Sequence, residues 1–196
     1  MPEKDSRIIL ASASPRRAEL LRQIGIDFEL APSQIAERPH PDEAPADYII
    51  RIARAKVIAV ARKHESGLII GADTVVVLDG RLLGKPTDKI EAEWMLGELS
   101  GNWHAVMTGV ALYDIATRRE AADYAKTLVR FAQLTDEEIQ WYVSSGEPMD
   151  KAGAYGIQGL AGLFVDEIAG NYYNVVGLPI PLVYRLARQL GYSFVK

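Results

Sequence analysis

The chain of 196 residues contains no cysteine. Disulfide bonds, thiolate zinc sites, iron–sulfur clusters and a cysteine nucleophile are therefore excluded. Histidine is scarce as well: His40, His64 and His104 are scattered along the chain and lack the spacing of metal ligands. We do not expect a histidine zinc site.

Long apolar runs and a surplus of basic charge are also missing. No apolar stretch approaches the roughly eighteen residues that a membrane-spanning helix needs. The first residues mix charges and do not match a signal peptide. The net charge is −4, whereas proteins that bind duplex nucleic acid usually carry a basic surplus. The sequence predicts a cytoplasmic protein that binds neither membranes nor nucleic acid.

The composition that remains is that of a globular protein. Hydrophobic residues make up 48% of the chain and charged residues 24%, a balance typical of soluble domains. A chain of this length buries roughly two-thirds of its unfolded surface, enough for a core without covalent crosslinks. We expect a single domain over residues 1–196, with two lobes left open and no separate linker.

Apolar runs typical of buried strands alternate with segments typical of helices. Ser14 before Pro15 predicts a helix start with a serine cap, and Asp79-Gly80 between two apolar runs predicts a hairpin. Thr135 and Glu138 predict a capping box at another helix start. Other expected strands span 8–11, 68–71, 103–113, 124–131, 164–168 and 172–176, and other expected helices span 48–67, 88–99 and 180–190. Alternation interrupted by hairpins predicts an α/β fold with a mixed sheet.

The turn after the first expected strand carries several donors for an anion. The amides and the dipole of the following helix favour negative charge at this position, where α/β folds usually bind ligands. The hydroxyls of Ser12 and Ser14 add donors, and the guanidinium groups of Arg16 and Arg17 can each bind two phosphate oxygens. The pattern favours a phosphate site, although a capped helix with solvated arginines fits the same residues.

Two further charged candidates follow the second expected strand. Asp73 comes two residues after it, where a carboxylate can ligate magnesium or accept a proton from water. A turn-forming acid is the alternative. Lys85 lies between Gly84 and Pro86 after the hairpin and could neutralise a polyphosphate, although a surface lysine in a turn is the more ordinary interpretation.

The segment from Asp150 to Gly159 is rich in glycine. Glycines let the backbone approach a ligand closely, and the Gln158 side chain carries the donor and the acceptor that recognition of a pyrimidine imide edge requires. The spacing is neither that of a Walker A loop nor that of a dinucleotide fingerprint. A purely structural loop is equally consistent with these residues.

In their order and spacing these segments resemble the Maf family of nucleoside triphosphate pyrophosphatases. The resemblance covers nearly the whole chain, and the matching segments are Leu10–Arg17, Gly71–Thr74, Gly84–Pro86, Leu99–Gly101 with His104, Asp150–Gly159 and Gly177–Pro179. It implies an inosine-triphosphatase-like three-layer α/β fold with a mixed, elongated sheet and a cleft between two lobes. It also implies hydrolysis of a nucleoside triphosphate to the monophosphate and pyrophosphate, assisted by a divalent cation, Mg²⁺ or Mn²⁺.

The segment Lys151–Gly159 looks like the branch of the family that acts on dTTP and UTP, with modified pyrimidine nucleotides left open as substrates. By this resemblance Asp73 is the proton acceptor, and Glu37 and Asp73 hold the metal. The residues implied to bind the triphosphate are Ser12, Ser14, Arg16, Arg17, Lys56 and Lys85, and those implied to set the base preference are Arg16, Thr74 and Gln158. A 7-methyl-GTP pyrophosphatase and a nucleotide-binding regulator of cell division remain alternatives, and a homodimer is left open.

Overall fold

The computed structural model describes residues 7–195, which fall into two compact units interleaved along the chain. The first unit holds residues 7–73, 108–125 and 177–195, and the second holds residues 74–107 and 126–176. Strands β3 (Leu68–Leu78), β5 (Trp103–Asp114) and β6 (Arg119–Phe131) contribute residues to both units. No helix within the described residues is long and apolar enough to cross a membrane.

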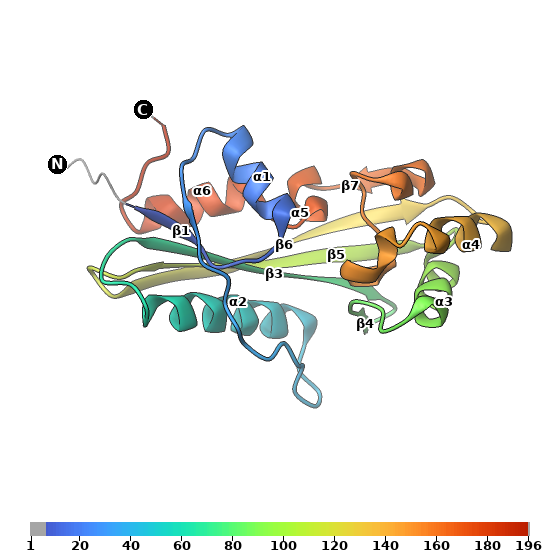
Figure 1. Ribbon diagram of the computed structural model, residues 1–196, viewed down its shortest axis with the longest axis horizontal. Helices are drawn as coiled ribbons and strands as arrows, with labels where there is room; N and C mark the ends of the chain where they lie inside the picture. Colours follow the sequence, from blue (N-terminus) through green and yellow to red (C-terminus); the bar gives the residue numbers. More distant parts are fainter. Residues whose placement is uncertain (1–6, 196) are drawn as a thin grey trace. The chain divides into compact units, whose positions relative to one another are not determined.

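The first unit is a sheet with helices on both faces. Strand β1 (Ile8–Leu10) pairs in parallel with β2 (Glu29–Leu30) and with β3, and the strand order continues through β5 to β6. Helix α2 (Pro45–Ala61) covers one face, whereas α1 (Pro15–Gln23) and α6 (Ile180–Gln189) cover the other (Figure 1). Helix, sheet and helix therefore form three layers within this unit.

Close packing of α2 against β3 depends on Gly71. The inner face of α2, including Ala53 and Val57, packs on buried residues of β1 and β3. A Cβ atom at Gly71 would lie 2.7 Å from Val57 Cγ1 and 2.8 Å from the carbonyl oxygen of Ala53, closer than real Cβ atoms approach such neighbours. The missing side chain therefore lets the helix approach the strand, and this approach fixes the position of Lys56 on α2.

The second unit contains antiparallel pairs and short helical turns. The second half of β3 pairs with β4 (Arg81–Leu83) across the Asp79-Gly80 turn, and β6 pairs with β7 (Val165–Ala169). Its helices are α3 (Lys89–Leu99), α4 (Asp136–Ser144) and α5 (Tyr172–Val176), and its 3₁₀ turns are η1 (Glu147–Asp150), η2 (Ala152–Ala154) and η3 (Leu160–Phe164). Parallel pairs in one unit and antiparallel pairs in the other confirm the predicted mixed-sheet α/β class.

Local signals predicted most of these boundaries. The capping box is confirmed, because Thr135 Oγ1 accepts the Glu138 amide at 3.2 Å and Glu138 Oε2 accepts the Thr135 amide at 2.8 Å. The expected break after Gly71 is wrong, since β3 continues to Leu78. Helix α2 begins earlier and ends earlier than expected, because it spans Pro45–Ala61.

The expected strand over 172–176 is a short helix instead. Asn171 Oδ1 accepts the amide of Asn174 at 3.0 Å, which satisfies a donor of the helical turn. The buried Asn174 side chain then donates to the carbonyl oxygen of Val106 at 2.9 Å and to Thr127 Oγ1 at 3.0 Å. These polar contacts across the second unit outweigh the β propensity of the tyrosines and valines.

Candidate functional site

The turn before α1 is organised around the hydroxyl of Ser12. Contrary to the prediction, the Ser14 side chain makes no capping hydrogen bond; its backbone amide donates to Ser12 Oγ at 3.2 Å. Ser12 Oγ also accepts a hydrogen bond from Arg17 Nη1 at 3.0 Å. Because the oxygen accepts two hydrogen bonds, the hydroxyl proton remains to serve as a donor.

Arg17 is buried, which distinguishes it from a solvated helix arginine. Its side chain joins two distant segments, because Nε donates to the carbonyl oxygen of Gly177 at 2.8 Å while Nη1 reaches Ser12. Burial lowers the pKa of Arg17, and the nearby carboxylates of Asp73 and Glu37 oppose that shift. Both acids therefore lie within electrostatic range of the turn.

Lys56 of α2 joins these two acids. Its Nζ lies 2.8 Å from Asp73 Oδ1, 2.8 Å from Glu37 Oε1 and 3.2 Å from the carbonyl oxygen of Ala72. The side chains of Lys56 and Asp73 are only 6% and 8% exposed, whereas that of Glu37 is 42% exposed. A buried ammonium group is stable only when it is paired, so one lysine holds two carboxylates from separate segments together.

Parallel strand pairing explains why the turn and the acids meet. Leu10 of β1 is opposite Ile70 of β3, and the Ala11 amide donates to the Ile70 carbonyl at 2.8 Å. Ser12 therefore follows the carboxyl end of β1, where α/β folds usually bind ligands, and Asp73 lies within β3 three residues past the partner of Leu10. The first unit brings together the polar residues Ser12, Arg17, Glu37, Lys56 and Asp73, which we call the Lys56 cluster.

The other predicted residues lie around this cluster or in the second unit. Ser14 and Arg16 are half-buried in the turn, and Thr74 is half-buried next to Asp73 in β3. Lys85 and Gln158 are exposed and belong to the second unit. Their segments contact each other there, because the Gly153 amide donates to the carbonyl oxygen of Gly84 at 2.9 Å. Their participation in one site with the Lys56 cluster stays a prediction.

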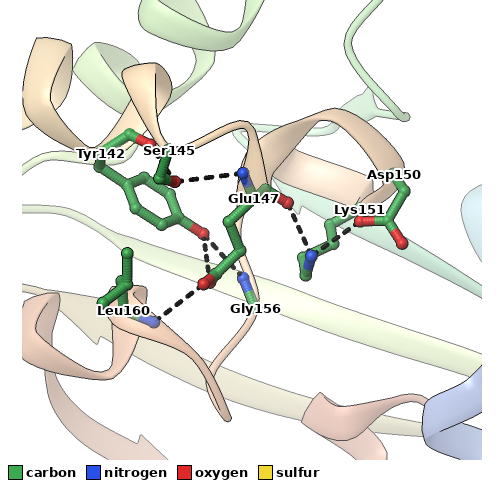
Figure 2. A network of polar contacts seen from close by, with 7 residues as sticks. All are labelled: Tyr142, Ser145, Glu147, Asp150, Lys151, Gly156 and Leu160. Atoms are coloured by element: carbon green, nitrogen blue, oxygen red, sulfur yellow. Dashed lines mark hydrogen bonds and ion pairs between the residues drawn. The ribbon is translucent and has the colours of Figure 1, made fainter.

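Sequence reasoning missed a polar network beside the glycine-rich segment (Figure 2). Tyr142 Oη donates to Glu147 Oε1 at 2.9 Å, and Glu147 Oε2 accepts the Leu160 amide at 3.1 Å. Burial and the bond to Glu147 raise the pKa of Tyr142, so its hydroxyl stays protonated. The only sequence signal was position, since both residues precede the glycine-rich segment by a few residues.

His104 has a structural role in the second unit. The ring is 2% exposed, and its Nε2 lies 2.8 Å from Tyr155 Oη in the glycine-rich segment. It packs edge-to-face against Phe131 and Tyr155. Burial lowers the pKa of His104 to about 4, so the ring is neutral near pH 7. A buried neutral imidazole of this kind anchors the segment to β5.

The acids of the Lys56 cluster suit a hard divalent cation that is bound together with a substrate. Within residues 7–195 no group of three or more His, Asp or Glu side chains could hold a metal ion by itself. Magnesium is commonly held by one or two carboxylates together with substrate phosphates, and Glu37 and Asp73 supply such a pair. The donor set therefore fits a cation that binds with a phosphate ligand.

Cationic side chains, the Ser12 hydroxyl and paired carboxylates therefore lie together on the α/β sheet of the first unit. A family model described as Maf-like protein matches residues 7–190. The dTTP/UTP pyrophosphatase of Symbiobacterium thermophilum is 52% identical over 186 residues, covering 95% of each chain. That of Geobacter metallireducens is 52% identical over 191 residues, covering 97% of this chain and 99% of its own. The chain belongs to the Maf-like protein family.

Solved structures resemble the chain only in part. The Ham1 protein of Staphylococcus aureus matches 64% of this chain and 72% of its own, with a TM-score of 0.46 and 14% identity. A nucleoside-triphosphatase / dITP/XTP pyrophosphatase of Mycobacterium abscessus matches 65% and 75%, with a TM-score of 0.42 and 19% identity. Similarity at this level carries no conclusion about the site.

Proposed function

We propose that this protein is a nucleoside triphosphate pyrophosphatase that hydrolyses dTTP and UTP to the monophosphate and pyrophosphate in the cytoplasm. The observation that carries the proposal is the Lys56 cluster, in which one buried lysine holds two carboxylates beside a turn of anion donors. Family membership and relatives named dTTP/UTP pyrophosphatase, 52% identical over nearly their whole length, support the same activity.

In this proposal the triphosphate binds at the turn before α1, next to the Lys56 cluster. The Ser12 hydroxyl and the first amides of α1 donate to phosphate oxygens, and Ser14 adds a second hydroxyl. Arg16, Lys56 and Lys85 neutralise the phosphate charge. Arg17 acts through Ser12, because its guanidinium group orients the Ser12 oxygen and adds positive potential without leaving its buried position.

Asp73 serves as the general base. A water molecule forms a bond to the α-phosphorus, the bond from that phosphorus to the bridging oxygen breaks, and pyrophosphate leaves with the electron pair. The Asp73 carboxylate accepts the proton of the attacking water. Lys56 keeps the carboxylate oriented, since it bonds Asp73 Oδ1 at 2.8 Å.

Glu37 and Asp73 would hold a divalent cation, Mg²⁺ or Mn²⁺. When bound, such a cation supplies positive charge that offsets the negative charge of the phosphates. Electrostatic stabilisation of this kind accounts for much of the catalysis of phosphoryl transfer. Lys56 contributes by holding both carboxylates within reach of its Nζ at 2.8 Å. The side chain of Glu37 is the more exposed of the two acids, which leaves it accessible to solvent.

Base preference rests on Arg16, Thr74 and Gln158. A site that hydrogen-bonds both polar edges of uracil or thymine rejects other bases, because the donors and acceptors that the bound base covers would stay unpaired. Gln158 carries the amide donor and acceptor needed for that edge. Replacing Gln158 with Ala should weaken the preference for UTP more than it weakens binding of the triphosphate.

The proposal is tested by pyrophosphate release from a panel of triphosphates with Mg²⁺, before and after a chelator. We expect dTTP and UTP to be the best substrates, and activity to disappear with the chelator and return with added cation. A preference for 7-methyl-GTP would assign the protein to the other branch. Tight binding of UTP without release of pyrophosphate would indicate a nucleotide-binding regulator instead.

A further inference from the structure

Gln158 lies at the tip of a tight turn in the second unit. The Gly159 amide donates to the carbonyl oxygen of Gly156 at 3.0 Å, which closes a four-residue turn with Ile157 and Gln158 at its centre. Gln158 is exposed, so its own side chain does little to fix the turn. The position of its amide therefore depends on what holds the two ends of the turn.

Both ends are held by one pair of side chains, Tyr142 and Glu147 (Figure 2). At the first end, the Gly156 amide donates to Tyr142 Oη at 3.3 Å. At the second end, the Leu160 amide donates to Glu147 Oε2 at 3.1 Å. The pair is itself closed, because Tyr142 Oη donates to Glu147 Oε1 at 2.9 Å. The turn, the phenol and the carboxylate thus form one continuous hydrogen-bonded ring.

The glycines on either side of Gln158 make room for this arrangement. A Cβ atom at Gly159 would lie 2.3 Å from Glu147 Oε1, and one at Gly156 would lie 2.6 Å from Lys151 Cε. Lys151 is fixed in turn, since its Nζ donates to the carbonyl oxygen of Glu147 at 2.6 Å and pairs with Asp150 at 2.7 Å. Glycine at both positions lets side chains press directly on the backbone of the turn.

We propose that the Tyr142–Glu147 pair is a positioning device that fixes the Gln158 turn and thereby sets the discrimination between bases. The inference rests on the proposed function, because it takes Gln158 as the residue that reads the base. Neither member of the pair needs to contact the nucleotide. Both act through the backbone that carries Gln158.

The physical reason is the angular dependence of hydrogen bonds. A hydrogen bond weakens steeply when its donor–hydrogen–acceptor angle departs from linearity. A loosened turn would let the Gln158 amide leave that geometry, and the site would then discriminate less between base edges. The phosphate contacts come from other residues and should persist. The pair should therefore affect the selectivity ratio between triphosphates more than the turnover of all of them.

The test replaces Tyr142 with Phe, which keeps the buried ring and removes the hydroxyl that joins both ends. We expect the ratio of kcat/KM for UTP over CTP to fall roughly three- to tenfold, the value of a lost hydrogen bond. Glu147→Ala should lower the ratio in the same direction, and Glu147→Gln should recover part of it because the amide oxygen still accepts one bond. If Tyr142→Phe does not fold, the Glu147 variants give the same readout.

Matched controls are available on neighbouring elements of the second unit. Tyr173→Phe removes the hydroxyl of a half-exposed tyrosine of α5, and Glu137→Gln removes an exposed charge on α4. Both should keep the wild-type ratio. Thermal unfolding of every variant identifies a purely structural role, which would lower the melting temperature while the ratio stayed unchanged and would overturn the inference.

A double-mutant cycle with Gln158→Ala separates the possible outcomes. If the pair acts through Gln158, adding Tyr142→Phe to Gln158→Ala leaves the ratio where Gln158→Ala alone put it. An equal further fall in both backgrounds overturns the positioning role but leaves the proposed function standing. If Gln158→Ala alone leaves the ratio unchanged, the base-reading role fails and the inference fails with it. Absence of pyrophosphate release from any triphosphate by the wild type would instead refute the proposed function itself.

Discussion

The first unit gathers buried charge around Lys56, whereas the second unit buries polar rings that stay neutral. Lys56 and Asp73 are an ion pair with almost no solvent exposure. In the second unit, burial lowers the pKa of His104 and raises the pKa of Tyr142 and of Tyr155, and each shift favours the neutral form. We call the Lys56 cluster the first centre and the rings of His104, Tyr142 and Tyr155 the second centre. The first centre stabilises buried polar groups by pairing opposite charges, whereas the second keeps them uncharged.

This difference in charge leads us to expect different roles for the two groups of residues. Removing one charge from a group of buried ion pairs leaves the other charges uncompensated. The charged groups of the first unit are therefore coupled to one another, and each can also interact with an incoming anion or cation. Neutral rings carry no charge that could pair with an incoming ion, and their hydrogen bonds and ring packing fix the backbone instead. We therefore expect substitutions in the first centre to act on catalysis, and substitutions in the second to act on loop position and on stability.

The largest effect is expected from Lys56→Met, which keeps the buried alkyl chain and removes the charge. Asp73 and Glu37 would then face each other without the ammonium that joins them. The free energy of unfolding should fall by about 3 kcal/mol, and pyrophosphate release should be lost. Urea denaturation and a UTP assay measure the two effects.

Lys63→Met is the matched control, since Lys63 is exposed directly after α2. It should change the free energy of unfolding by less than about 0.5 kcal/mol. A Lys56→Met protein as stable and as active as the wild type would show that the ion pairs of the first centre are dispensable, and the comparison between the units would lose its basis.

Asp73→Asn should separate catalysis from folding. The amide keeps the size of the side chain but accepts a proton far less readily, so turnover of UTP should fall by at least about a hundredfold. Lys56 keeps its pairing with Glu37, so the fold should survive. Circular dichroism and a UTP assay decide this together, with Asp79→Asn in the hairpin turn as the control. Full activity would remove Asp73 from the mechanism.

The sequence predicted elements whose causes are local. The hairpin at Asp79-Gly80 and the Thr135–Glu138 capping box depend on residues within three positions of each other, and both are present. The candidate residues of the first unit were found in the same way: Ser12 and Asp73 each follow a recognisable apolar run, and strand pairing brings them together. The family resemblance added the assignments of Glu37 and Lys56, which no local pattern carried.

Features that depend on distant contacts could not be predicted. The helix over Tyr172–Val176 has a strand-like sequence, and contacts of Asn174 with Val106 and Thr127 hold it. The Ser14 side chain makes no cap, and the Ser14 amide donates to the hydroxyl of Ser12, a contact that cap propensity does not predict. Tyr142 and Glu147 were missed because their function depends on a turn whose geometry appears only in three dimensions.

The neutral character of the second centre predicts a dependence of stability on pH. The unfolded chain protonates His104 below its ordinary pKa of 6.5, whereas the folded chain does so only near pH 4. As the pH falls from about 6.5 to 4, the unfolded state therefore binds the proton first, and the free energy of unfolding should drop by roughly 3 kcal/mol. Above pH 6.5 this contribution is fully present.

His104→Gln isolates the effect because it keeps a hydrogen-bonding group near Tyr155 and removes the titration. Urea denaturation between pH 7 and 4 should give a shallower loss of stability in the variant than in the wild type. Parallel slopes for the two proteins would mean that the ring is not held neutral, and that the second centre does not differ from the first in this respect.

The smallest expected effect comes from Gly71→Ala, which tests whether the packing of α2 on β3 positions Lys56 next to Asp73. The added methyl group would meet Val57 Cγ1 at 2.7 Å and the Ala53 carbonyl oxygen at 2.8 Å. The Ala53 carbonyl oxygen belongs to the helix backbone and cannot move independently, so α2 must shift as a whole. This shift should lower the free energy of unfolding by about 1–3 kcal/mol. Activity on UTP should fall with it, since the shift moves Lys56.

Gly97→Ala provides the contrast in the second unit, because nothing lies within 4 Å of a Cβ atom at this position in α3. It should raise the free energy of unfolding by up to about 1 kcal/mol through helix propensity alone and leave activity unchanged. If Gly71→Ala instead behaved like Gly97→Ala, the contact between α2 and β3 would not control the charged centre. An added methyl group would then have the same effect on stability and activity in both units. The packing around Gly71 predicts instead that it lowers stability and activity in the first unit and lowers neither in the second.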